Sequence, residues 1–221
     1  MKEFLKCYYK ELEKLKNDKN NIAIFQVGSS KNLDFTKLKE NIKDIDIFII
    51  SEQIEEQIRY TKTIYDIELD INKFSIKHVD KMIESKEYFF INEMKDAKII
   101  YDRYNMGKNV INLSKIKYEE GPEKISKENL LVISTTIYDN ISRLKEKDKF
   151  ENYEYEFLTN IYLKDIIKGY FIINSKWIPK DKKIFKYLSE NEKDLFKLAK
   201  KVCEDYNYYN LEKVYKYVFN D

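Results

Sequence analysis

The feature that most constrains this chain is a pair of short apolar segments joined by a polar linker. The first segment covers residues 22–27 and ends at Gly28-Ser29-Ser30. The second covers residues 45–50 and opens with Asp44-Ile45-Asp46. Apolar runs of this length, bounded by polar and turn residues, are typical of buried β-strands. We therefore predict two strands of one sheet, with a glycine-serine corner at the end of the first strand.

Two aspartates stand at the start of the second predicted strand. Side chains alternate along a strand, so Asp44 and Asp46 share one face. Two like charges about 4 Å apart repel by roughly 4 kcal/mol at an effective dielectric constant near 20. A bound cation would offset that repulsion, and carboxylate oxygens suit Mg²⁺. The alternative is that the two aspartates are simply the solvated start of a strand.

Acidic side chains also line one face of the strand predicted over residues 64–74. In this segment Asp66, Glu68 and Asp70 fall on one face, and the apolar residues between them fall on the other. An amphipathic edge strand would show the same alternation. If one of the three binds a metal ion, Asp70 is favoured over Glu68, although the alternation alone does not separate these two residues.

The remaining pattern predicts an α+β fold, a small mixed β-sheet domain followed by a C-terminal α-helical bundle. We predict a first domain over residues 1–111 and a helical domain over residues 112–221. Within the first domain we expect helices over 3–16, 34–39 and 75–95, a polar helix or ordered loop over 51–62, a strand over 97–101 and a loop over 102–108. Within the second we expect helices over 125–147, 151–173, 180–203 and 210–219.

Composition excludes several classes of protein. The chain has 41 Lys and Arg against 39 Asp and Glu, a net charge of +2, which disfavours a protein that coats nucleic acid. Cys7 and Cys203 have no neighbours at zinc-ligand spacing. No segment approaches the roughly 20 apolar residues of a membrane span, and no apolar signal segment is present, so we expect a cytoplasmic protein. The oligomeric state stays open, a homodimer included.

The order of these motifs resembles the nucleotidyltransferase fold of the polymerase β superfamily over roughly residues 20–102. Gly28-Ser29 matches the Gly-Ser corner of that family, Asp44-Ile45-Asp46 matches its Asp-x-Asp motif, and Asp70 or Glu68 matches its third carboxylate. The helical half is similar to the small-molecule branch, typified by aminoglycoside and lincosamide nucleotidyltransferases. One departure is Lys43, which stands before Asp44 where the family often has Ser-Asp.

The resemblance implies a nucleotidyltransferase that uses an NTP as donor and releases pyrophosphate. It implies that Asp44, Asp46 and Asp70 hold two Mg²⁺ ions, and that Asp70 also helps to activate the acceptor hydroxyl. It implies that Gly28, Ser29 and Ser30 bind the triphosphate through backbone N–H groups. The acceptor would be a small molecule, with nucleic acid an unlikely partner.

Two other functions remain open at this point. The same fold could transfer a nucleotide to RNA or to a protein partner, as an antitoxin does. It could also be a non-catalytic domain that binds nucleotides or serves as a scaffold.

Overall fold

The computed structural model describes residues 2–32 and 43–219, so the helix predicted over 34–39 lies outside the described residues. The chain divides into two compact units, Met1–Glu120 and Gly121–Asp221. The α+β class is confirmed, because a mixed sheet in the first unit is followed by a bundle of helices in the second. The domain boundary predicted after residue 111 falls inside α4 (Met106–Glu119).

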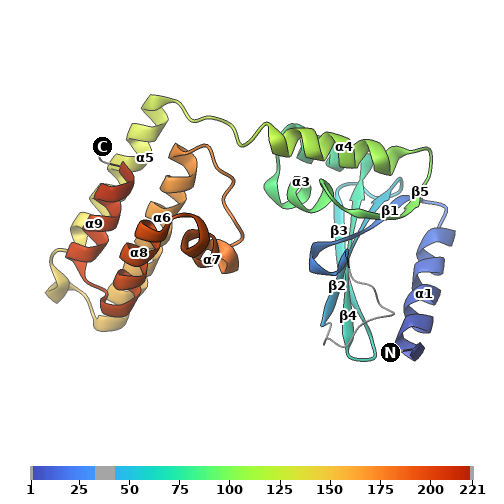
Figure 1. The fold of residues 1–221 in the computed structure, drawn as a ribbon, viewed down its shortest axis with the longest axis horizontal. Helices are drawn as coiled ribbons and strands as arrows, with labels where there is room; N and C mark the ends of the chain where they lie inside the picture. Colours follow the sequence, from blue (N-terminus) through green and yellow to red (C-terminus); the bar gives the residue numbers. More distant parts are fainter. Residues whose placement is uncertain (1, 33–42, 220–221) are drawn as a thin grey trace. The chain divides into compact units, whose positions relative to one another are not determined.

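The first unit is built on a five-stranded sheet with the order β3-β4-β2-β1-β5 (Figure 1). In the described part of the chain, β2 and β4 are the one parallel pair, and the other neighbouring strands are antiparallel. The elements are α1 (Lys2–Asn17), β1 (Asn21–Val27), the 3₁₀ turn η1 (Gly28–Ser30), β2 (Asp44–Ser51), β3 (Gln57–Ile64), β4 (Ile67–Ser75), α2 (Ile76–Glu84), α3 (Tyr88–Met94), β5 (Lys98–Asp102) and α4 (Met106–Glu119).

The sheet is covered on both faces, which explains why its central strands are apolar. On one face α1 packs over isoleucines of β1, β2 and β4. The opposite face holds an aromatic cluster in which the ring of Phe48 lies 5.0 Å from that of Phe74, and the ring of Phe74 lies 5.4 Å from that of Phe90 on α3. Asp46 and Asp70 lie on this second face. Asp46 is two residues before Phe48 on β2, and Asp70 is four residues before Phe74 on β4. The packed aromatic rings therefore fix the backbone that presents the acidic side chains.

The prediction of a helix or ordered loop over residues 51–62 is wrong, because β3 occupies residues 57–64. This strand lies at the edge of the sheet and is exposed along most of its length. The segment does alternate, with Ile58, Tyr60 and Ile64 on one face and polar residues between them, but its overall polarity led to the assignment as a helix or loop. The strand predicted over 64–74 is the end of β3 joined to β4 through a turn at Tyr65 and Asp66.

Three other boundaries differ from the prediction, each at a residue with unusual backbone angles. The helix predicted over 75–95 is divided into α2 and α3 near Lys86, whose φ is +52°. The loop predicted over 102–108 ends early, since α4 begins after Asn105 with φ of +58°. The helix predicted over 180–203 is divided at Glu192, which has φ of −142° and ψ of 65°.

The second unit is a bundle of helices with its own core. Leu163, Ile167 and Phe171 of α6 pack against Leu188 and Leu195 in this core. Its elements are α5 (Lys127–Arg143), the 3₁₀ turn η2 (Lys147–Lys149), α6 (Asn152–Ile173), α7 (Asp181–Asn191), α8 (Lys193–Asp205) and α9 (Tyr208–Phe219). In the part of the chain that the structure describes, no helix has the length and apolar character that crossing a membrane would require.

The aromatic cluster predicts a large effect of Phe74→Ala. Phe74 is fully buried, so removing its ring should lower the free energy of unfolding of the sheet by about 3–5 kcal/mol. Hydrogen exchange of the β4 backbone amides measures this loss. The matched control is Phe157→Ala on α6, where the side chain is 64% exposed and the same change should cost less than about 0.5 kcal/mol. Equal effects of the two substitutions would contradict this packing.

Candidate active site

The acidic residues of β2 and β4 meet because these two strands are parallel neighbours. Asp46 lies opposite Asp70 in the strand register, and Asp44 lies opposite Glu68. Neighbouring strands are about 4.8 Å apart, so each pair brings two carboxylates close together on one face. Asp46 and Asp70 are half-buried, whereas Asp44 and Glu68 are exposed. The register therefore singles out Asp70 as the carboxylate that faces Asp46.

Gly28 connects the glycine-serine corner to this acidic pair. Its φ is +69°, in the left-handed region that glycine adopts without strain. A Cβ atom at this position would lie 2.2 Å from Oδ2 of Asp46. The corner and the Asp46 carboxylate are thus in direct contact, and only glycine fits between them.

Arg59 on the edge strand β3 forms a two-point ion pair with Asp70. Its Nε donates to Oδ1 of Asp70 at 2.9 Å, and its Nη2 donates to Oδ2 at 2.7 Å. Asn72 also donates to Oδ1 of Asp70, at 3.2 Å. Both oxygens of this carboxylate therefore have partners from within the chain.

The carboxylates of the two strands act together on Arg59. Its pKa is raised, first because Asp70 accepts its hydrogen bonds and carries a negative charge, and further because of the charges on Asp46 and Glu68. Three carboxylates thus favour a positive charge at one position. This is the place in the sheet unit where the sequence predicts a cation.

The sequence suggests that the N–H groups of the glycine-serine corner face a phosphate, but the Gly28 N–H faces an acidic side chain. The Gly28 N–H donates to Oε2 of Glu93 at 3.0 Å, and Glu93 is buried on α3. Ser29 is exposed, whereas Ser30 is buried and its hydroxyl donates to the carbonyl of Val27 at 3.3 Å. Hence Glu93 holds an N–H group that was expected to meet a phosphate, and the exposed Ser29 is the residue of the corner that is open to solvent.

Lys31 is also held within the chain, since its Nζ lies 2.5 Å from Oδ1 of Asp96. Asp96 follows α3, the same helix that carries Glu93. Two acidic side chains from this region therefore approach the corner. They occupy groups that could otherwise contact a phosphate.

Comparison with known proteins supports the fold of the chain. No protein-family model and no curated protein matches the sequence. Among solved structures, a nucleotidyltransferase-like protein from Exiguobacterium sibiricum superposes with a TM-score of 0.50 at 10% sequence identity. The match covers 95% of this chain and 73% of that protein. The chain has a nucleotidyltransferase-like fold. At this identity the likeness concerns the fold alone.

The acidic strands of the first unit meet some of the requirements of a divalent cation. Within residues 2–32 and 43–219, no three acidic, histidine or cysteine side chains are grouped tightly enough to hold a metal ion in the present arrangement. In this arrangement both oxygens of Asp70 accept hydrogen bonds from Arg59. The donor atoms nevertheless fit Mg²⁺, because they are carboxylate oxygens from adjacent strands beside a corner without a Cβ.

Sequence reasoning did not find Arg59 or Glu93. Arg59 lies on the strand that was predicted as a helix or loop, and a correct assignment of β3 would have placed it beside the acidic strand. Glu93 lies in a segment predicted as helix, where nothing in the sequence distinguishes it from a solvated acidic residue. Its contact with Gly28 depends on tertiary packing over 65 positions of the chain.

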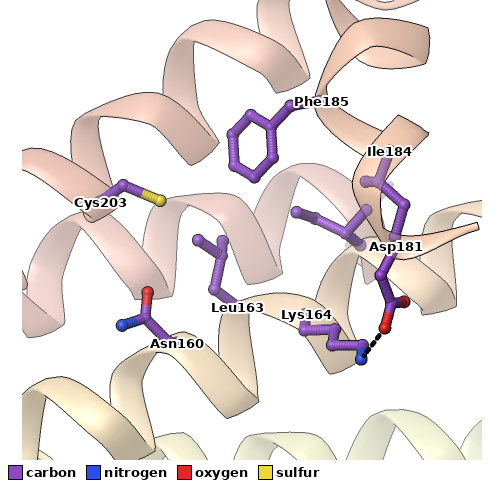
Figure 2. Close-up of a pocket in the computed structure, with 8 residues that line it drawn as sticks. Asn160, Leu163, Lys164, Asp181, Ile184, Phe185 and Cys203 are labelled. Carbon is purple, nitrogen blue, oxygen red and sulfur yellow. Dashed lines mark hydrogen bonds and ion pairs between the residues drawn. The ribbon is translucent and has the colours of Figure 1, made fainter. Parts of the chain in front are cut away.

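Two pockets of the helical unit are lined by residues that the structure describes. Figure 2 shows the smaller, with a volume of about 140 Å³, which is lined by Leu163, Phe185 and Cys203 and bordered by the Lys164–Asp181 ion pair. The larger measures about 310 Å³ and is lined in part by Lys145 and Lys147. Typical small-molecule sites begin at about 300 Å³, so only the larger pocket reaches that size.

Lys176, in the loop before α7, is neutralised by an acidic partner. Lys176 Nζ lies 2.9 Å from Oε1 of Glu192 and 2.5 Å from the hydroxyl of Tyr170. The hydrogen bonds from Tyr170 and Lys176 lower the pKa of Glu192. Lys176 therefore stabilises the junction between α6 and α8, as expected for a structural residue.

The contact between Gly28 and Asp46 predicts different outcomes for two glycine substitutions. Gly28→Ala and Gly121→Ala both force alanine into a left-handed conformation, with φ of +69° and +77°, at a cost of about 1–2 kcal/mol. Only Gly28→Ala also displaces the Asp46 carboxylate, because the nearest atom to a Cβ at Gly121 is 3.8 Å away. We expect Gly28→Ala to weaken Mn²⁺ binding by about tenfold or more, measured by electron paramagnetic resonance. Gly121→Ala should leave it unchanged, and equal losses would contradict a site at Asp46.

Proposed function

We propose that this protein is a divalent-cation-dependent nucleotidyltransferase. It would transfer a nucleoside monophosphate from an NTP to a hydroxyl group of a small molecule and release pyrophosphate. The observation that carries the proposal is the register of the parallel strands, which places Asp46 beside Asp70 while Gly28 packs against Asp46. The nucleotidyltransferase-like fold supports the same class of reaction.

The groups of this chain have distinct roles in the proposed reaction. Asp44, Asp46 and Asp70 would hold Mg²⁺, which supplies neutralisation of the charge on the transferring phosphoryl group. The exposed Ser29 would bind the outer phosphates of the NTP, and the Gly28 N–H would join it on release from Glu93. These contacts hold the triphosphate in place so that its α-phosphorus faces the acceptor.

The reaction balances as a single displacement. The acceptor oxygen forms a bond to the α-phosphorus, and the bond from that phosphorus to the oxygen shared with the β-phosphate breaks. The pair of electrons in that bond leaves with pyrophosphate. The proton of the acceptor hydroxyl would pass to a carboxylate, and we assign this role to Asp70 because it lies beside Asp46 in the strand register.

A small-molecule acceptor agrees with the charge of the chain. A polynucleotide acceptor requires an extended positive surface, whereas the net charge here is only +2. Among the lysines near α7, Lys176 is already paired with Glu192. We therefore favour a small acceptor over RNA, without assigning its chemical identity.

The proposal predicts that Asp70 and Glu68 contribute unequally. Asp70→Asn should lower pyrophosphate release by about 100-fold or more, because a carboxylate beside Asp46 is lost. Glu68→Gln should lower it by less than about tenfold, because Glu68 is exposed and lies opposite the exposed Asp44. The assay is pyrophosphate release from the four NTPs with Mg²⁺ and a panel of small polyhydroxylated acceptors.

A matched control for the same assay is Asp66→Asn. Asp66 is exposed in the turn before β4, outside the register with β2. Its replacement should leave turnover unchanged. The proposal fails if Asp70→Asn turns over at the wild-type rate, or if no NTP with Mg²⁺ raises the melting temperature. A ligand at 100 times its dissociation constant stabilises a folded protein by roughly 2.7 kcal/mol.

A further inference from the structure

Arg59 is placed to respond to whatever binds at the acidic strands. Its side chain is 64% exposed, whereas that of Asp70 is 15% exposed. The carboxylate is therefore fixed by the sheet, and the guanidinium reaches it from solvent on the outer strand β3. Of the two partners, the guanidinium is the one that can leave without disturbing the packed core.

A divalent cation at Asp70 competes directly with Arg59. The guanidinium uses Oδ1 and Oδ2 together, at 2.9 and 2.7 Å. A cation shared by Asp46 and Asp70 needs at least one of these oxygens. It would also place a second positive charge beside the guanidinium, so the two-point ion pair and the bound cation oppose each other.

A released guanidinium has a suitable new partner in a polyphosphate. The planar fork of arginine matches phosphate oxygens as well as carboxylate oxygens, and it binds both in a two-point manner. Lys31, which lies next to the corner in the chain, is paired with Asp96. Gly28 lies against Asp46, so a triphosphate at the corner would be next to the strand pair that Arg59 already reaches.

We propose that Arg59 exchanges partners during substrate binding: it holds Asp70 when no cation is bound, and it binds the phosphates of the nucleotide once a divalent cation occupies the acidic strands. This inference rests on the proposed function and adds to it a residue that contacts substrate. Arg59 thus opposes the metal in the free protein and supports the nucleotide in the loaded one.

The exchange predicts opposite signs for one substitution. Arg59→Gln removes the positive charge and keeps hydrogen-bond donors. In the absence of nucleotide it should bind Mn²⁺ roughly tenfold more tightly than the wild type, because the competing cation is gone. At saturating Mn²⁺ it should bind the non-hydrolysable α,β-methylene analogue of ATP roughly tenfold more weakly, because a phosphate ligand is gone. Electron paramagnetic resonance measures the first affinity and calorimetry measures the second.

Two further variants separate the exchange from a structural role. Arg103→Gln removes another arginine of the same unit, whose guanidinium donates to the Lys19 carbonyl at 3.0 Å, and should change neither affinity. In an Asp70→Asn background, Arg59→Gln should no longer strengthen Mn²⁺ binding, because the two effects act through the same pair. Circular dichroism checks that each variant is folded.

The outcomes distinguish this inference from the proposed function. Tighter Mn²⁺ binding together with weaker analogue binding supports the exchange. Any other pair of changes in the affinities of Arg59→Gln for Mn²⁺ and the analogue overturns the exchange. The proposed function still stands in that case if the wild-type protein binds both Mn²⁺ and the analogue. A wild-type protein that binds neither Mn²⁺ nor the analogue overturns the proposed function and the exchange together.

Discussion

The parallel pairing of β2 with β4 is the constraint on which the rest of the site depends. Both strands are central and carry apolar side chains that are almost completely buried, such as Ile47 and Ile71. A slip of one residue would move those side chains away from α1 and place carboxylates under α1 instead, so the register is strongly fixed. The same register sets Asp46 beside Asp70. Burial of the core thus determines the geometry of the acidic pair.

The charged and polar groups of the site are neutralised by other groups of the same chain. Arg59 occupies Asp70, Glu93 accepts from the Gly28 N–H, and Asp96 pairs with Lys31. In each case the partner has the same charge as the ligand expected there. The cationic Arg59 takes the place of a metal ion, and the anionic Glu93 and Asp96 take the place of phosphates. Such internal partners lower the cost of like charges in the free protein, and a ligand must bind more strongly than they do to replace them. Under the exchange proposed for Arg59, a bound cation would raise the affinity of the protein for the nucleotide.

The sequence was most informative where burial and chemistry agree. Residues 22–27 and 44–51 could be assigned as strands because their apolar runs are continuous, and the order of Gly28, Asp44 and Asp46 indicated the fold. The edge strand β3 was missed because its exposed position makes the segment polar overall, which obscures the alternation of Ile58, Tyr60 and Ile64. The hairpin turn at Tyr65 was missed because a tyrosine with φ of +55° replaces the usual glycine or asparagine. Arg59 and Glu93 could not be found, since their roles come from contacts between distant segments.

The central claim is that Asp46 and Asp70 share a divalent cation beside the glycine-serine corner. The most direct measurement is anomalous diffraction from crystals of the protein grown with Mn²⁺ and a non-hydrolysable triphosphate. The account predicts a manganese peak between the carboxylates of Asp46 and Asp70, with phosphate density at Gly28 and Ser29. A manganese peak at another position, or triphosphate density away from the end of β1, would contradict it.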